Sequence, residues 1–262
     1  AQNTSTGTES LEANTTGAFN TAHGYAALEA NTTASNNTAV GAYALLRNTT
    51  GTRNVSVGNN ALDANTTADS NTAVGSYALT TCTTAAGNTA VGDAALGNST
   101  TGGHNVAVGF NALLAVTTAG NNTSIGRESG LRLTTGGHNI MVGDFSGEKL
   151  TTGTSNVLIG RLSGAHNIYL ATGSNNTLIG ALADTTAAGT DFANVIGYDV
   201  SGAGGYTTVG YSAQDSRLAA GGTTWATISD ERYKKDIVDS TAGLAFINAL
   251  QPRTWKYKTL GE

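Results

Sequence analysis

The chain is built on the segment Asn37-Thr38-Ala39-Val40-Gly41-Ala42-Tyr43-Ala44-Leu45-Leu46-Arg47-Asn48-Thr49-Thr50-Gly51-Thr52-Arg53, because close variants of it recur every 17 residues. The glycine recurs at ten positions: Gly7, Gly24, Gly41, Gly58, Gly75, Gly92, Gly109, Gly126, Gly143 and Gly160. An asparagine precedes each glycine by four residues, and a Thr pair keeps the same spacing. A fixed short period of this kind predicts one structural unit copied along an axis, which is a solenoid.

Composition excludes several classes of function. Charged residues make up 12% of the 262 residues, the net charge is −5, and Lys149 is the first lysine, with the next at Lys234. This distribution argues against a nucleic-acid partner, which requires clustered Lys and Arg. No run of 18 apolar residues occurs, so we expect no membrane insertion. The single cysteine, Cys82, excludes an intrachain disulfide, and we expect an inert thiol. The sequence begins inside a repeat, which predicts a longer parent protein.

Each repeat predicts one coil of two short strands and two bends. Asn37-Thr38-Ala39-Val40-Gly41 is typical of a strand ended by glycine, and Tyr43-Ala44-Leu45-Leu46 is predicted to form a second strand. Asn48-Thr49-Thr50-Gly51 is typical of a turn. Coils stacked at about 4.8 Å would place equivalent side chains in columns along the axis.

Three columns are expected to form the interior. The apolar column before the glycine is Val40, Val57, Val74, Val91, Val108, Ile125, Val142 and Ile159. The column four residues after the glycine is Leu11, Leu28, Leu45, Leu62, Leu79, Leu96 and Leu113. The asparagine column, from Asn3 to Asn156, is expected to form a hydrogen-bonded side-chain ladder with a structural role.

The repeat changes after Gly126, where Ala-Leu gives way to Ser-Gly at residues 129–130, 146–147 and 163–164. Larger apolar residues appear elsewhere in the repeat at the same point: Val116, Leu133 and Leu150 near the Thr pair, and Met141 and Leu158 before the glycine. Because packed cores conserve volume better than identity, we expect core volume to move from one corner of the coil to another.

Three segments follow from these patterns: regular solenoid repeats over 1–160, an irregular β-rich continuation or cap over 161–228, and a charged segment over 229–262. The fold class is therefore all-β, a β-solenoid or β-roll, with a short α+β C-terminal segment. That segment is expected to hold a helix through residues 243–250 and a strand through 254–258. A coil core this thin buries little apolar area, which favours association of chains and predicts a homotrimeric fibre.

The charged segment carries a specific motif. Ser229-Asp230-Glu231-Arg232-Tyr233-Lys234-Lys235-Asp236-Ile237, followed by Leu250-Gln251-Pro252 and Trp255-Lys256-Tyr257, resembles the start of the intramolecular chaperone domain of phage tail spikes and fibres, the S74 peptidase family. The Asn-Thr-Ala-Val-Gly-x-x-Ala-Leu array resembles the β-roll head repeats of trimeric autotransporter adhesins.

The chaperone resemblance implies a mechanism. Chaperones of this family trimerise, assist winding of the fibre, and then cut themselves off before the motif serine. Carried onto this chain, the resemblance implies cleavage of the Ile228-Ser229 bond, with Ser229 as nucleophile and Lys234 as its base. Asp230 and Arg232 would orient the site. No cofactor, no metal and no substrate-directed enzymatic activity are expected.

Other chemistries find less support. His104 and His138 share a repeat position but lie two coils apart, about 10 Å, too far for one metal. Nothing indicates the carboxylate pair of a glycosidase. The Asn-x-Thr sequences at Asn14, Asn31, Asn48 and Asn65 are turn residues in a phage fibre but would be glycan acceptors in a secreted filament. Adjacent threonines point to opposite faces, so each coil offers one outward Thr, which disfavours an ice-binding solenoid.

The sequence therefore predicts the shaft of a homotrimeric phage tail fibre or surface adhesin, located in the virion tail, with a self-cleaving chaperone at its C-terminal end. Its partners would be two copies of itself and a host cell-surface glycan or protein receptor. The alternative is an extracellular filament or adhesin on a cell surface, with an ice-binding solenoid less favoured.

Overall fold

The computed structural model describes residues 2–212, 214–224 and 226–227. The chain divides into two units, Ala1–Ile228 and Ser229–Glu262. The helix and strand predicted after residue 240 lie outside the described residues. Everything below concerns the first unit, in which the described residues form strands and turns and no helix. The all-β prediction is confirmed for this part of the chain.

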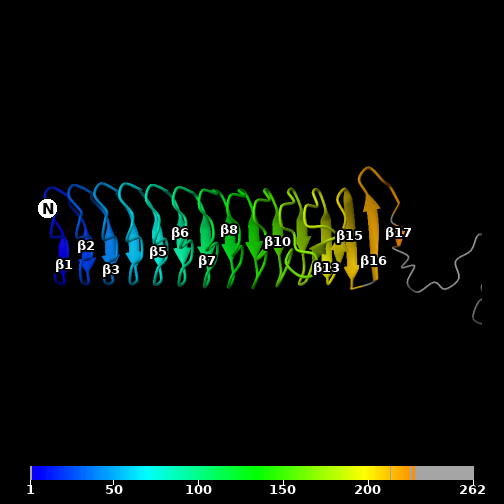
Figure 1. The fold of residues 1–262 in the computed structure, drawn as a ribbon, viewed down its shortest axis with the longest axis horizontal. Helices are drawn as coiled ribbons and strands as arrows, with labels where there is room; N and C mark the ends of the chain where they lie inside the picture. The colour runs from blue at the N-terminus through cyan, green and yellow to red at the C-terminus, as the bar shows by residue number, and fades with distance from the viewer. Residues whose placement is uncertain (1, 213, 225, 228–262) are drawn as a thin grey trace, which may run out of the picture. The chain divides into compact units, whose positions relative to one another are not determined.

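The first unit is a β-solenoid in which each 17-residue coil contributes one short strand to a continuous sheet (Figure 1). The strands are β1 Thr4–Thr6, β2 Thr21–His23, β3 Thr38–Val40, β4 Val55–Val57, β5 Thr72–Val74, β6 Thr89–Val91, β7 Val106–Val108, β8 Thr123–Ile125, β9 Ile140–Val142, β10 Val157–Ile159, β11 Thr177–Ile179, β12 Asp184–Thr185, β13 Asn194–Tyr198, β14 Ser201–Gly202, β15 Tyr206–Tyr211, β16 Gln214–Ala219 and β17 Ala226–Thr227. The main sheet orders them β1 to β11, then β13, β15, β16 and β17.

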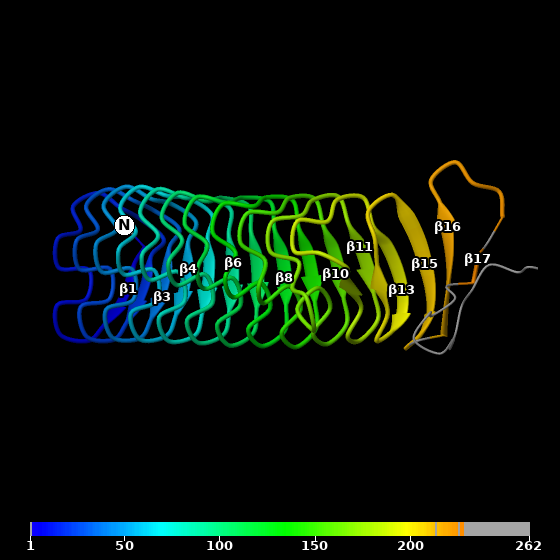
Figure 2. The same ribbon diagram turned by 45° about the vertical axis from the view of Figure 1, so that its right-hand side comes forward.

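The coils stack in register. Thr38 of β3 pairs with Val55 of β4, and Val40 with Val57, in a parallel ladder that repeats from β1 to β15. Figure 2 shows the turns that close each coil opposite the sheet. Because each strand from β1 to β9 pairs with the strand 17 residues later, the period fixes the register of these regular coils.

The second predicted strand of each coil is wrong. In the coil of β3, residues 42–47 form tight turns, and Tyr43 and Leu45 have φ values of 60° and 51°. The Ala44 N–H donates to the Gly41 carbonyl within the coil, while the Leu45 N–H donates to Ala61 of the next coil. Left-handed residues at every second position cannot continue a strand. This segment therefore bends the chain while still hydrogen-bonding along the axis.

The leucine column forms the core, as predicted: Leu28 to Leu113 are fully buried at each repeat position, and Leu11 in the first coil is partly buried. The prediction for the column before the glycine is wrong, because these Val and Ile side chains face outward. Val91 is 36% exposed and Ile125 42%. The residue one position earlier is buried instead, as Ala39, Ser56 and Ala73 show. Successive strand residues point to opposite faces, so only the middle residue of a three-residue strand faces inward.

Core volume moves across the coil as predicted. Met141 and Leu158 replace alanine at the inward strand position, and both are fully buried. A Cβ added to Gly130 would lie 2.8 Å from the Met141 methyl carbon, so the glycines of the Ser-Gly pairs make room for the larger side chains. The buried Ser146 hydroxyl donates to the carbonyl oxygen of Leu158, 2.9 Å away. Val116, Leu133 and Leu150 fill the opposite corner and are also fully buried.

The period lengthens to 20 residues between Gly160 and Gly180, and a buried carboxylate organises the longer coil. Asp184 of β12 is fully buried and accepts hydrogen bonds from the backbone N–H groups of Asn167 at 2.8 Å and Ile168 at 3.1 Å. It also accepts one from the N–H of Thr185 at 2.8 Å. Farther along, β15 and β16 pair antiparallel, which ends the parallel stacking.

Candidate functional site

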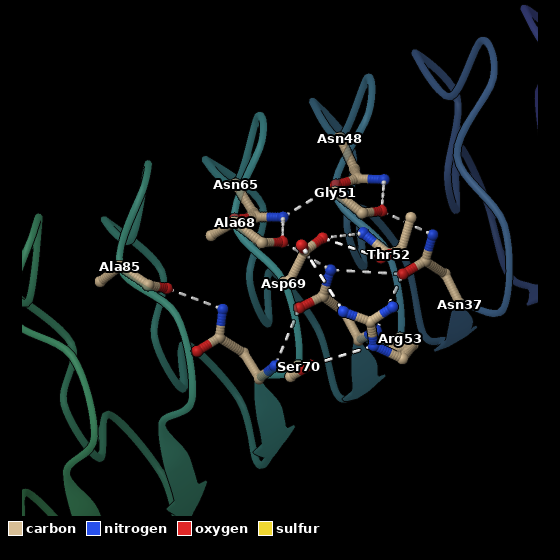
Figure 3. Close-up of polar contacts among 12 residues, drawn as sticks. Asn37, Asn48, Gly51, Thr52, Arg53, Asn65, Ala68, Asp69, Ser70 and Ala85 are labelled. Carbon is tan, nitrogen blue, oxygen red and sulfur yellow. Dashed lines mark hydrogen bonds and ion pairs between the residues drawn. The ribbon is translucent and has the colours of Figure 1, made fainter.

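The principal asparagine ladder runs inside the solenoid, as predicted; Figure 3 shows one member, the buried Asn37, whose Nδ2 donates to the Gly51 carbonyl at 2.8 Å. Asn71 is fully buried; its Oδ1 accepts the backbone N–H of Asn88 at 2.9 Å and its Nδ2 donates to the Ala85 carbonyl at 2.8 Å. The Asn71 N–H in turn donates to Asn54 Oδ1 at 2.9 Å. The same pattern links the asparagines from Asn3 to Asn176. Each amide thus ties the start of a strand to the turn of its own coil and to the next coil.

A second ladder joins the asparagines of the Asn-Thr-Thr turns, and it is interrupted at Cys82. Asn65 Nδ2 donates to Asn48 Oδ1 at 2.8 Å, but Asn65 Oδ1 is buried without a hydrogen-bond partner. Cys82 occupies the next position, where an asparagine amide would donate to that oxygen. The Cys82 thiol instead contacts the Ala85 carbonyl at 3.3 Å.

Burial raises the pKa of the Cys82 thiol from an ordinary 9.0 to about 11. The thiol is fully buried and is neutral at physiological pH. Because the thiolate is the reactive form, a thiol that burial keeps neutral is inert, as the sequence predicted.

Burial of the second ladder also shows whether its Asn-x-Thr sequences could carry glycans in the folded chain. Asn31, Asn48 and Asn65 have no exposed surface, and their amides are used in hydrogen bonds. A glycan on any of these three nitrogens has no room in the folded solenoid. Their role is structural, which is the interpretation the sequence offered for a phage fibre.

Each Thr pair presents one free threonine. The Thr49 hydroxyl donates to the Thr66 carbonyl of the next coil at 3.0 Å, whereas Thr50 is exposed. The same arrangement recurs at Thr134 and Thr135. The pair therefore offers a single outward row of hydroxyls, as predicted.

Ion pairs on the surface follow the axis from one coil to the next. Asp69 accepts the Thr52 N–H at 2.6 Å and lies 3.7 Å from Arg53, and these contacts, the backbone one foremost, hold its pKa below the ordinary value (Figure 3). Arg127 donates to Asp144 at 2.9 Å, an interaction that lowers the pKa of the carboxyl and raises that of the guanidinium. Exposed pairs of this kind contribute little stability each, so they adjust coil stacking more than they drive it.

The two histidines at equivalent positions, His104 and His138, are both exposed and lie in coils separated by the coil of Asn121. Among the residues that the structure describes, no group of three or more His, Cys, Asp or Glu side chains could hold a metal ion. In the same residues there is no helix long and apolar enough to cross a membrane.

The predicted cleavage site lies outside the described residues. This applies to Ser229, Lys234, Asp230 and Arg232, and to Ile228 on the other side of the scissile bond. The described structure ends with β17 at Thr227, directly before these residues.

Comparison with known protein families gives a match for this second unit. Residues 229–262 match the S74 peptidase family, described as the chaperone of endosialidase. No curated protein and no solved structure matches the chain. The match confirms the chaperone resemblance, and it begins at the serine that the motif marked.

A repetitive β-solenoid followed by the start of an endosialidase-type chaperone defines a class of protein. The combination indicates a structural protein of the phage tail fibre or tailspike kind. The described residues form a long, regular surface, and the hydrogen bonds of the interior keep the coils beneath that surface in register.

Proposed function

We propose that the protein is the shaft of a homotrimeric phage tail fibre, or of a similar surface adhesin, that projects a host-binding region from the virion tail. The observation that carries the proposal is the family match at residues 229–262, which follows directly on the last strand of the solenoid. In this role the partners are two further copies of the chain and a host cell-surface glycan or protein.

The interior supports a mechanical function. Each coil is joined to the next by a strand ladder, by the Asn71-type amide and by the hydroxyl of the first threonine of each pair. Buried hydrogen-bond networks with all members satisfied rigidify a structure. Thirteen strands pair in parallel: β1 to β11, β13 and β15. At about 4.8 Å per strand they extend about 58 Å along the axis of the solenoid. Such a unit holds its two ends at a fixed distance.

The chaperone segment completes the proposal with a self-cleavage step. The Ser229 hydroxyl attacks the carbonyl carbon of Ile228 while the neutral Lys234 amine accepts the hydroxyl proton. The C–N bond between Ile228 and Ser229 then breaks as the protonated Lys234 returns the proton to the Ser229 nitrogen, which leaves as a free amine and creates an ester between Ile228 and the Ser229 oxygen. Water hydrolyses this ester to a carboxylate on Ile228 and the free Ser229 hydroxyl. Asp230 and Arg232 orient the two reacting groups.

Mass spectrometry of the denatured full-length protein tests this function. The wild-type shaft chain is expected to end at Ile228, and Ser229→Ala and Lys234→Ala are expected to leave the chain intact. Lys235→Ala provides the matched control, because it removes the neighbouring lysine and should still be cleaved. An intact wild-type chain, or cleavage that persists in Ser229→Ala, would refute the self-cleavage. An intact wild type would also favour the alternative, an extracellular filament that retains its C-terminal segment.

A further inference from the structure

The outward side of the main sheet has no assigned role in the proposed function. We call it the outer sheet face and define it by two columns of outward strand residues. The first column is Thr4, Thr21, Thr38, Val55, Thr72, Thr89, Val106, Thr123, Ile140, Val157, Thr177, Asn194 and Thr207. The second column is Thr6, His23, Val40, Val57, Val74, Val91, Val108, Ile125, Val142, Ile159, Ile179, Ile196 and Val209.

Charge is excluded from this face. Neither column contains an Asp, Glu, Lys or Arg, although such residues occur at the turns of the same coils, for example Arg53, Asp93 and Arg127. Most positions carry the β-branched residues Val, Ile or Thr. Depletion of charge distinguishes the core of a protein interface from the rest of a protein surface.

The face is polar at its N-terminal end and carries a continuous apolar column from β3 onward. At the N-terminal end it presents Thr4, Thr6, Thr21 and His23. From Val40 of β3 to Val209 of β15, every residue of the second column is Val or Ile. These side chains are large and well exposed: Ile159 is 37% and Ile196 43% exposed. A monomer would leave this apolar stripe in water along its whole length, and contiguous exposed stripes of this kind mark interaction sites.

The dimensions suit association with another copy of the same chain. The face is about 58 Å long and about 10 Å wide, since a three-residue strand spans about 10 Å. This gives roughly 600 Å², of the same order as the 800 Å² or so that each partner contributes to a standard interface. A second copy has the same length, the same coil spacing and the same β-branched columns. When two sheets pack face to face, such side chains interdigitate and the sheets lie about 10 Å apart.

We propose that the copies of this chain pack against one another through the outer sheet face, from β3 to β15. The proposal rests on the homotrimer of the proposed function and adds the face through which the copies meet. Contacts are weakest at β1 and β2, where the face carries threonines and His23. The exposed row of second threonines, such as Thr152, stays on the outside of the assembly.

Cross-linking of two matched cysteine variants tests the face directly. Ile159→Cys places a thiol on the outer sheet face, and Thr152→Cys places one on the threonine row of the preceding coil. The native Cys82 is buried and stays silent. A bis-maleimide that spans about 10 Å, the spacing of packed sheets, should join chains of Ile159→Cys and leave chains of Thr152→Cys separate. Equal cross-linking of both, or cross-linking of Thr152→Cys alone, would overturn the proposal.

Light scattering on the full-length protein separates this proposal from the proposed function. Ile159→Lys should raise the dissociation constant of the assembly at least about 100-fold, because it buries like charges from every copy. Thr152→Lys should leave it unchanged, and Thr21→Lys should raise it by less than about tenfold. Ile159→Thr, which keeps a residue type native to this column, guards against misfolding and should weaken association to a smaller degree.

A trimeric wild type that Ile159→Lys leaves intact would refute the face and spare the proposed function, whereas a monomeric wild type would refute both. If the wild type is a monomer that shows thermal hysteresis and Ile159→Lys abolishes it, the face binds ice and the proposal is wrong.

Discussion

Replacing Asn71 by alanine tests the interior ladder on which the solenoid depends. The side chain of Asn71 satisfies two buried backbone groups, the Asn88 N–H and the Ala85 carbonyl. Without it, the N–H has no partner, and the carbonyl keeps only the weak Cys82 thiol contact at 3.3 Å. A buried polar group left unsatisfied costs about 1–3 kcal/mol. The free energy of unfolding should therefore fall by about 2–6 kcal/mol.

Urea unfolding followed by circular dichroism measures this change, and hydrogen exchange of the Asn88 amide locates it. The control is Asn98→Ala, since Asn98 is exposed and its side chain makes no hydrogen bond in the described structure. A surface change of that kind should stay within about 0.5 kcal/mol. If both variants lose the same stability, or the Asn88 amide keeps its protection in Asn71→Ala, the ladder has no energetic role and the reasoning fails.

Four further substitutions probe other parts of the solenoid. Gly75→Ala adds a Cβ 2.3 Å from the carbonyl oxygen of the next glycine at a φ of 137°, so it should cost at least about 3 kcal/mol by urea unfolding. Gly205→Ala, with no atom within 4 Å of the added carbon, should cost about 1 kcal/mol. Cys82→Asn supplies a donor to the unpartnered Asn65 oxygen, so the free energy of unfolding should rise by about 1 kcal/mol and the melting temperature should rise with it. A lower melting temperature would contradict the interrupted ladder. Asp184→Asn replaces a triple acceptor by an amide and should cost about 1–3 kcal/mol, with new proteolytic cuts between residues 164 and 173 and none in the regular coils.

The sequence predicted the architecture because the period is strict. Equivalent residues 17 positions apart must stack, and this alone placed Leu45 and Asn37 in buried columns. The compensation between Leu113-type and Met141-type positions was also predictable, because total core volume is constrained at every coil. These inferences depend on the repeat and require no knowledge of which face of the strand is inward.

Which strand residues point into the coil was not predictable in the same way. A strand of three residues has two outward positions and one inward, and Thr38-Ala39-Val40 looks more apolar at its end than at its centre. Hydrophobicity thus favoured Val40 as core, whereas in this coil the inward position is held by the smaller Ala39, beside the buried Leu45. The left-handed turns at Tyr43 and Leu45 were equally hidden, since neither residue type signals a positive φ.

Those errors bear on function. The valine and isoleucine column that looked like core is half of the outer sheet face, and the proposed packing of further copies of the chain on that face would account for its composition. The family match supplies the chaperone that would bring such copies together. The candidate cleavage residues, Ser229 and Lys234, were found through their motif alone, because their role depends on a segment that follows the repeats.

Native mass spectrometry of the purified full-length protein would test the trimeric fibre and its self-cleavage together, because one spectrum reports the number of chains and the mass of each. We expect a complex of three chains, each ending at Ile228. A monomer whose chain continues through Ser229 would contradict both the trimeric fibre and its self-cleaving chaperone.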